Sequence, residues 1–268
     1  MKITRHYPTL SHLFFADDVL LFLKADTQEC KSVLEVLDIY CRASGQQVNF
    51  DKSSVQFSTN VQLQVYNSIC ALSGLKTTPA NAKYLGLPSF WGRSKAEAFQ
   101  FIIEKVLSKL QGWKSKLLSQ AGKEILIKAV VQAIPSYAMA CFAFPKWFCT
   151  RMKAYISKFW WGGDPEGRGI HWINWDLLAL SKFKGGLGFR DFKAFNLALL
   201  ARQGWRLLKY PNSFCARILQ GIYFPHSSFL EAVKGHRASW AWASILQGRN
   251  VLMEGLRWQM HSGANGQF

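Results

Sequence analysis

The sequence predicts an α+β fold in which a small ββαββ unit is followed by a mostly α-helical remainder. Short aromatic and β-branched runs occur within residues 1–60, apolar residues then recur at helical spacing, and turn-forming residues separate these segments. Of the 268 residues, 49% are hydrophobic and 15% aromatic. That much apolar surface can offset the entropy lost when a chain folds, so a disordered protein is excluded.

The first predicted element is a hairpin. Two apolar runs, 13–15 and 19–23, flank the segment Ala16-Asp17-Asp18. Short apolar runs on either side of a polar pair are typical of two strands joined by a tight turn. The sequence therefore places the two carboxylates at the tip of the hairpin.

A helix and two more strands are predicted to complete this unit. Asp26 and Glu29 have the spacing of a capping box at the start of the helix, and Gly45 can end it. Beyond Gly45, the segments 47–50 and 54–57 are predicted to be short strands joined by a turn.

Helices are predicted through the rest of the chain, where apolar residues recur every three or four positions. The expected helices cover residues 61–72, 94–110, 122–133, 145–162, 191–209, 212–222 and 239–247. A polar stretch with Gly and Pro at 164–168 is the predicted boundary within this part. We therefore expect three regions, covering residues 1–60, 61–163 and 164–268.

Charge is distributed unevenly along the chain. Lys and Arg number 33 against 16 acidic residues, which gives a net charge of +17. Residues 1–60 hold six basic and seven acidic residues, whereas residues 61–268 hold 27 and nine. So basic a region favours polyanions, nucleic acid above all, over other partners. A basic surface without any partner is the alternative.

The cysteines and the apolar segments indicate the cellular compartment in which the protein is expected. The six cysteines have no spacing typical of zinc sites or disulfide frameworks, which favours a reducing compartment and no zinc. Residues 1–5 do not resemble a signal peptide, and the apolar window 129–144 is short and interrupted by polar residues and proline. We expect an intracellular protein, nuclear or cytoplasmic, that is neither secreted nor inserted in a membrane.

Adjacent carboxylates at the tip of a hairpin suggest metal chemistry. Asp17 and Asp18 repel each other when both are ionised, unless a cation neutralises them. Mg²⁺ takes hard oxygen ligands and bridges them to phosphates. Turns often contain Asp-Asp pairs for structural reasons, so the pair by itself also fits a simple turn.

The sequence around this pair resembles the reverse transcriptases of LINE-type (non-LTR) retrotransposons of plants. The resemblance extends over most of the chain and follows the family's order of landmarks. The segments that carry it are Ser11–Phe22, Ser44–Ser53, Tyr84–Pro88, Gln111–Lys114, Phe159–Gly163, Ile170–Trp172 and Gly185–Arg190. It implies a partial palm over 1–60, a helical thumb over 61–163, and a C-terminal helical region over 164–268 that stops before the family's downstream Cys/His segment.

The resemblance also implies roles for individual residues. Asp17 matches an aspartate that binds the catalytic metal, Mg²⁺ or Mn²⁺, and Asp18 matches its neighbour, which supports the same ions. Lys52 matches a basic position near incoming phosphates. Alternatively, Lys52 is a turn residue that pairs with Asp51. The implied partners are RNA and DNA, in the form of a primer–template duplex.

The residues expected to contact that duplex lie in the thumb. Trp113 is flanked by lysines, among them Lys114 and Lys116. An aromatic side chain between cations suits nucleic acid. Packing in the helical core is the alternative for Trp113, as it is for most of the 11 tryptophans.

The family's first metal-binding aspartate belongs to a strand upstream of the residues present here. One carboxylate segment cannot hold two metal ions in a fixed geometry, so this chain is expected not to polymerise alone. The alternative function is a non-catalytic basic helical module that binds the nucleic-acid backbone, and a decayed element product without selected function is a third. A palm strand cut off from its sheet would also expose an edge for association with another chain.

Overall fold

The computed structural model describes residues 9–79, 82–88, 95–114, 118–162, 170–236 and 238–257, without the side chains of residues 95, 96, 98 and 114. The chain divides into two compact units, Met1–Phe90 and Trp91–Phe268. The three regions inferred from the sequence stay a prediction, as does the boundary at 164–168, which lies outside the described residues.

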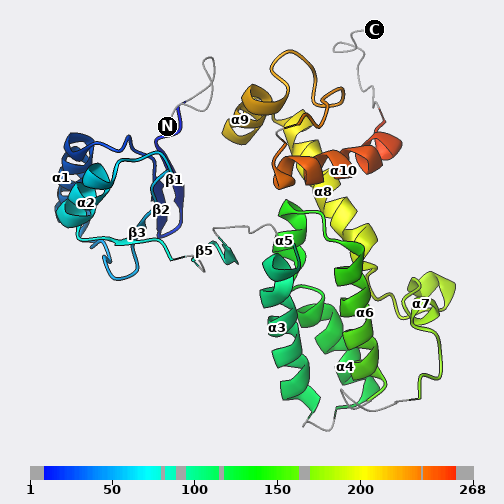
Figure 1. Ribbon diagram of the computed structural model, residues 1–268. Coiled ribbons are helices and arrows are strands. Elements are labelled where there is room, and N and C mark those ends of the chain that lie inside the picture. The colour runs from blue at the N-terminus through cyan, green and yellow to red at the C-terminus, as the bar shows by residue number, and fades with distance from the viewer. Residues whose placement is uncertain are drawn as a thin grey trace. The chain divides into compact units, whose positions relative to one another are not determined.

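The predicted α+β class with a mostly helical remainder is confirmed (Figure 1). In unit 1 the elements are β1 His12–Phe15, β2 Asp18–Leu21, α1 Thr27–Ser44, β3 Ser54–Val55, α2 Leu63–Ser73, β4 Lys76–Thr77, β5 Lys83–Tyr84 and β6 Leu87–Pro88. In unit 2 they are α3 Lys95–Lys114, α4 Gln120–Leu126, η1 Ile127–Val131, α5 Ser136–Cys141, α6 Lys146–Trp160, α7 Trp175–Leu178, η2 Lys182–Lys184, α8 Phe192–Lys209, α9 Phe214–Tyr223 and α10 Trp240–Gly255.

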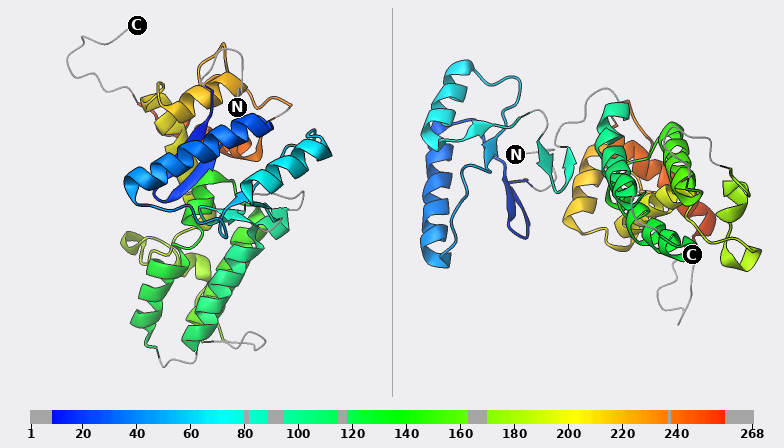
Figure 2. Two further views of the ribbon diagram at one scale, coloured as in Figure 1. Left: turned by 90° about the vertical axis from the view of Figure 1, so that its left-hand side faces the viewer. Right: turned by 90° about the horizontal axis from the view of Figure 1, so that it is seen from below.

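In unit 1, α1 begins and ends where the sequence predicts. The Asp26 carboxylate accepts a hydrogen bond from the Gln28 backbone N–H at 2.9 Å, and Gly45 ends the helix with a φ of 71°. Glu29 departs from the predicted capping box. Its carboxylate accepts from the backbone N–H of Lys24 instead, at 2.9 Å, and so ties the chain before the helix to its first turn. The two helices α1 and α2 pack against each other (Figure 2).

The predicted strand at 47–50 is wrong. Residues 46–49 form no regular element, and β3 pairs in parallel with β4. The reason is local competition for hydrogen bonds. The side chain of Asn49 accepts a hydrogen bond from the Lys52 backbone N–H at 3.1 Å. The backbone carbonyl of Asn49 accepts one from the Ser53 N–H at 3.0 Å. These bonds stabilise a turn rather than a strand.

In the first part of unit 2, α3 packs against α6 and α4 packs against α6 (Figure 1). The apolar stripe predicted for α3 is confirmed at most of its positions. Phe99 is fully buried, and its ring centre lies 4.1 Å from that of Phe144 and 5.6 Å from that of Phe148. The Ser119 hydroxyl caps α4, whose path continues as the π-helical turn η1. Ser94, which has capping-box spacing with Glu97 and is therefore predicted to cap α3, lies outside the described residues.

In the second part of unit 2, α8 packs against both α5 and α10. Figure 1 shows α10 crossing α8. Asp191 caps α8 by accepting from the Ala194 N–H at 2.7 Å. Trp242 of α10 is fully buried and stacks on Tyr223 and Phe224, with ring centres 4.8 and 5.4 Å away. The predicted helix at 239–247 extends eight residues farther, to Gly255.

Across the residues that the structure describes, no helix has the length and apolar character that crossing a membrane requires.

Candidate metal-binding hairpin and nucleic-acid interface

The β1–β2 hairpin carries the aspartate pair as the sequence predicts. The strands pair antiparallel, with Phe14 opposite Val19 and Phe15 opposite Asp18. Ala16 and Asp17 therefore form a two-residue turn, and Asp18 is the first residue of β2. The strands continue to pair beyond their ends, since the Phe22 N–H donates to the Ser11 carbonyl at 2.8 Å.

The turn contains a conformation that is unusual for its residue type. Ala16 has a φ of 52°, in the left-handed region that favours glycine. A left-handed first position is what a tight hairpin of this length requires. The local geometry therefore turns the chain sharply between Phe15 and Asp18 and leaves Asp17 at the tip.

Both carboxylates of the hairpin face solvent. Asp17 and Asp18 are exposed, and neither carboxylate has a hydrogen bond or an ion pair with any residue that the structure describes. Adjacent, unneutralised carboxylates fit a hard divalent cation. In the described ranges, however, no three His, Cys, Asp or Glu side chains are grouped so that they could hold a metal ion. The hairpin therefore offers two ligand groups, both from one segment.

The strands of the hairpin are apolar and uncovered. Phe14 is 67% exposed, Phe15 60% and Val19 47%. β1 and β2 form a sheet of two strands, so each has one edge without a strand partner in the described part of the chain. A two-stranded hairpin is marginally stable by itself in water. Further polypeptide over this sheet would stabilise it, and the predicted association through its edge stays a prediction.

Lys52 lies in the turn between α1 and β3, in the same unit as the hairpin. It is exposed, and among the described residues no ion pair joins it to Asp51. Its backbone N–H is bound by the Asn49 side chain. The side chain of Lys52 is therefore available to an anion, and its contact with phosphates stays a prediction.

Trp113 lies near the end of α3 and packs against α6. Its ring centre is 6.1 Å from that of Phe159, and the side chain is half-buried. Trp113 therefore contributes to the helix contact and keeps part of its surface open to solvent. Lys114 is the last residue of α3; its side chain, like the whole of Lys116, lies outside what the structure describes.

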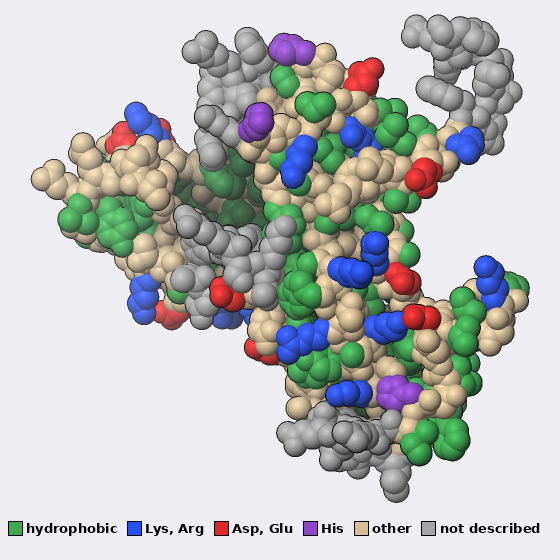
Figure 3. Space-filling model, turned by 45° about the vertical axis from the view of Figure 1, so that its right-hand side comes forward, with side chains coloured by type: hydrophobic (Ala, Val, Ile, Leu, Met, Phe, Trp, Pro, Cys, Tyr) green, Lys and Arg blue, Asp and Glu red, His purple; other side chains and the backbone are tan. Residues whose placement is uncertain are grey.

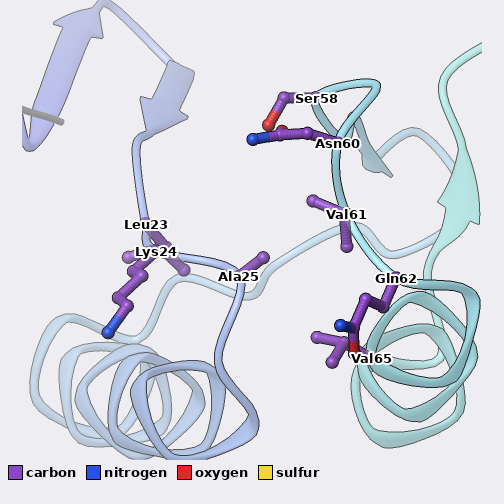
Figure 4. Close-up of a pocket in the computed structure, with 8 residues that line it drawn as sticks. All are labelled: Leu23, Lys24, Ala25, Ser58, Asn60, Val61, Gln62 and Val65. Carbon is purple, nitrogen blue, oxygen red and sulfur yellow. The ribbon is translucent and has the colours of Figure 1, made fainter.

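A pocket in unit 1 lies apart from the aspartates. It is lined by Leu23–Ala25 on one side and by Ser58, Asn60–Gln62 and Val65 on the other (Figure 4). Lys24 is its charged side chain, and no carboxylate lines it. The pocket therefore has no set of groups for metal binding or acid–base chemistry.

Four of the six cysteines have a raised pKa, which is the opposite of what a catalytic thiol requires. Burial, supported by the charge of Asp191, raises the pKa of the Cys149 thiol to about 11. Burial also raises the pKa of Cys30, Cys141 and Cys215. Because the thiolate is the reactive form, these side chains are poor nucleophiles at neutral pH.

One basic surface was not predicted from the sequence. Arg202, Trp205, Arg206 and Lys209 of α8 are all exposed. Figure 3 shows lysine and arginine side chains spread among hydrophobic ones over the visible face of the helical unit. The signal that could have identified this surface is the absence of any acidic residue between Asp191 and Glu231.

No protein-family model matches the chain. It is 45% identical over 125 residues to the uncharacterized mitochondrial protein AtMg00310 of Arabidopsis thaliana, a match that covers 46% of this chain and 81% of that protein. It is also 32% identical over 185 residues to a putative ribonuclease H protein, At1g65750, of the same plant. A further relative, 25% identical over 177 residues, is the transposon TX1 uncharacterized 149 kDa protein of Xenopus laevis.

The chain belongs to the same family as the uncharacterized mitochondrial protein AtMg00310. The other two matches cover 68% and 65% of this chain, but only 30% of the ribonuclease H protein and 13% of the transposon protein. The chain thus corresponds to a minor part of these two longer relatives.

Proposed function

We propose that this chain is part of a retrotransposon reverse transcriptase and contributes one carboxylate-bearing segment to a two-metal polymerase centre. The observation that carries the proposal is the position of Asp17 and Asp18 at the turn of an otherwise apolar hairpin. The ordered sequence landmarks downstream of the hairpin support it. The similarity to a protein named as a transposon product supports the same origin.

Asp17 and Asp18 would hold Mg²⁺ or Mn²⁺ through their carboxylate oxygens, the ligands that these ions prefer. The bound ion would supply charge neutralisation for phosphoryl transfer. Two ions about 4 Å apart cannot both be fixed by one pair of neighbouring side chains. We therefore propose that a carboxylate from further polypeptide completes the centre, and that this chain alone does not extend a primer.

The helical unit would hold the primer–template duplex. Residues 91–268 carry 25 basic and nine acidic residues, a net charge of +16, whereas residues 1–90 carry eight and seven. The exposed part of Trp113, together with Lys114 and Lys116, would contact the duplex backbone. Such contacts position a duplex without reading its sequence.

Titration with Mn²⁺, followed by electron paramagnetic resonance, tests the metal site. The double variant Asp17→Asn/Asp18→Asn is expected to weaken Mn²⁺ binding by at least about tenfold, because both carboxylate ligands are lost. The control is Asp38→Asn, which removes an exposed carboxylate of α1 that pairs with Arg42 at 2.8 Å. Equal Mn²⁺ binding by the wild type and the double variant would show that the hairpin is not a metal site.

A primer-extension assay tests the proposal that this chain alone does not form a complete two-metal centre. The chain is expected to incorporate no nucleotide with Mg²⁺ or Mn²⁺ on a primed RNA template. Template-dependent incorporation that disappears in Asp17→Ala would contradict this and would mean that the chain holds a complete centre.

The second candidate function is that of a non-catalytic module that binds the phosphate backbone of nucleic acid. The concentration of positive charge in residues 91–268 favours it. The two candidates differ in their dependence on the hairpin. Duplex binding that persists without any specific Mn²⁺ binding at Asp17 and Asp18 would favour the module.

A further inference from the structure

The C-terminal half of α8 has cations and an aromatic side chain on one face. Arg202, Arg206 and Lys209 recur at intervals of four and three residues, with Trp205 among them. Residues three and four apart are neighbours on the surface of a helix. All four are exposed, and Trp205 is 44% exposed. These side chains therefore form one continuous strip on the solvent side of α8.

Beyond Lys209 the chain turns toward α9, whose first residue follows the end of α8 by five positions. Tyr210 is 55% exposed, and the Lys209 ammonium group lies 5.6 Å from the centre of its ring. Arg217 of α9 is exposed as well. The positive charge of Arg206 also acts on Cys215 of α9, where it partly opposes the rise in the thiol's pKa. We call Arg202, Trp205, Arg206, Lys209, Tyr210 and Arg217 the α8–α9 surface.

No negative charge of the described chain pairs with the α8–α9 surface. Residues 192–230 contain five basic residues and no acidic one. Within the described ranges, the ion pairs involve other residues. Among the described residues, the one hydrogen bond of the Arg206 guanidinium goes to the neutral side chain of Gln203, at 3.3 Å. The positive field of this surface therefore stays uncompensated and attracts an anion.

Packing does not explain why these side chains are here. The opposite side of α8 supplies the buried residues Leu200, Gly204 and Leu207. A Cβ atom on Gly204 would lie 3.1 Å from the Phe229 ring and 3.4 Å from Leu252 of α10, so this side is in close contact with its neighbours. The exposed face is thus not needed for the core, although it holds two large aromatic side chains.

We propose that the α8–α9 surface binds a single strand of nucleic acid. The cations would contact phosphates, and Trp205 and Tyr210 would stack on bases. Unpaired bases offer their faces to aromatic side chains, whereas a duplex hides them in its own stack. Lys209 follows Arg202 by seven positions, which corresponds to about 10 Å along the helix and allows the cations to contact neighbouring phosphates of one strand.

This proposal goes beyond the polymerase function proposed above, since it requires neither the hairpin nor a metal ion. The α8–α9 surface would bind a single strand, whereas Trp113, Lys114 and Lys116 would contact the duplex. The two surfaces share no residue. The two surfaces can therefore be tested independently in the full chain.

Fluorescence anisotropy with labelled oligo-dT, oligo-U and a random 20-base-pair duplex tests the proposal. Arg206→Glu/Lys209→Glu is expected to weaken oligo-dT and oligo-U binding by at least about tenfold, and Trp205→Ala by about tenfold. Duplex affinity is expected to change about threefold or less in Trp205→Ala, because stacking on unpaired bases is what this variant removes.

Matched variants control for net charge and for the loss of a tryptophan. Lys182→Glu/Lys184→Glu makes the same change of charge at exposed lysines of η2, and Trp172→Ala removes a tryptophan that is 77% exposed. Both controls are expected to bind oligo-dT within about twofold of the wild type, because neither removes a contact in the proposed strip. Circular dichroism and thermal melting of every variant show whether the substituted chain folds. If Arg206→Glu/Lys209→Glu does not fold, the oligo-dT affinity of Trp205→Ala decides the test.

Three results would overturn the proposal. The first is unchanged oligo-dT binding in the α8–α9 variants, and the second is an equal loss in the charge control, which would mean that only the overall field matters. The third is displacement of oligo-dT by poly-glutamate at equal charge concentration, which would identify an acidic protein surface as the better ligand. Failure of Mn²⁺ binding or of duplex binding by Trp113 and Lys114 variants would leave these results unaffected.

Discussion

At the scale of single residues, one buried amide holds the centre of unit 2 together. Asn196 of α8 is 3% exposed. Its Nδ2 group donates to the carbonyls of Met139 and Phe142, at 2.7 and 2.9 Å, and its Oδ1 accepts from the Phe144 N–H at 2.8 Å. It therefore satisfies the backbone groups left open where α5 ends and the chain turns toward α6. Nothing in the sequence distinguishes this asparagine from an exposed helix residue.

Replacing Asn196 by Ala should strongly destabilise unit 2. The buried Met139 carbonyl and Phe144 N–H and the partly buried Phe142 carbonyl would each lose the hydrogen bond to Asn196, at roughly 1–3 kcal/mol each, so we expect the free energy of unfolding to fall by about 3 kcal/mol or more. Urea denaturation followed by circular dichroism measures the change. Asn250→Ala, at an exposed position of α10, is the control and should stay within about 0.5 kcal/mol of the wild type. Equal effects of the two substitutions would contradict the role assigned to Asn196.

At the scale of elements, the contact between α8 and α10 depends on the lack of a side chain at Gly248. A Cβ atom at this position would lie 2.4 Å from the backbone nitrogen of Ala201 and 2.7 Å from the Cβ of Leu200. The two helix backbones therefore approach each other more closely than any other residue type allows. Glycine is intrinsically unfavourable inside a helix, so the close approach explains its presence in α10.

Gly248→Ala should separate α10 from α8. Because the new methyl group would meet backbone rather than a flexible side chain, we expect a loss of about 2–4 kcal/mol in the free energy of unfolding. Thermal and urea denaturation measure it. Gly255→Ala, in the same helix with no atom within 4 Å of the new Cβ, should be neutral or stabilising by up to about 1 kcal/mol. A neutral Gly248→Ala would contradict the close contact.

Local signals predicted most elements well because they act over a few residues. Asp26 caps α1 as the sequence indicates, α8 begins within one residue of its predicted start at 191, and Gly45 and Gly74 end α1 and α2 in the left-handed region. The prediction failed at 47–50, where side-chain hydrogen bonds of Asn49 compete with strand formation. The extent of α10 was also underestimated, since its packing on α8 stabilises residues with a weak helical pattern.

At the scale of the whole molecule, positive charge is concentrated in the helical unit. Residues 91–268 carry a net charge of +16, whereas residues 1–90 carry +1. The unit that holds the candidate metal ligands is therefore nearly neutral, and a polyanion is attracted mainly to the other unit. This difference in charge predicts where nucleic acid binds without specifying its sequence.

Duplex binding by the whole chain should therefore depend steeply on salt. Each phosphate neutralised contributes a slope of about −0.9 to log K against log salt, so we expect a slope of about −3 or steeper for any duplex sequence. Lys114→Gln/Lys116→Gln should make the slope shallower by about 2, since two contacts are removed. The control Lys182→Gln/Lys184→Gln should change it by less than about 1. Affinity that is equal at low and high salt would contradict binding through the backbone.

The sequence by itself determined the class of fold, the ends of most helices, the hairpin with Asp17 and Asp18 at its tip, and the basic character of the larger unit. These features depend on local hydrogen bonds, on periodicity and on composition, which can be read along the chain. Only the tertiary structure decided that Trp113 packs on α6, that Asn196 binds three distant backbone groups, and that Arg202, Trp205, Arg206 and Lys209 lie on the exposed face of α8. Each of these depends on which face of a helix is buried, and that is settled by contacts between residues far apart in the chain.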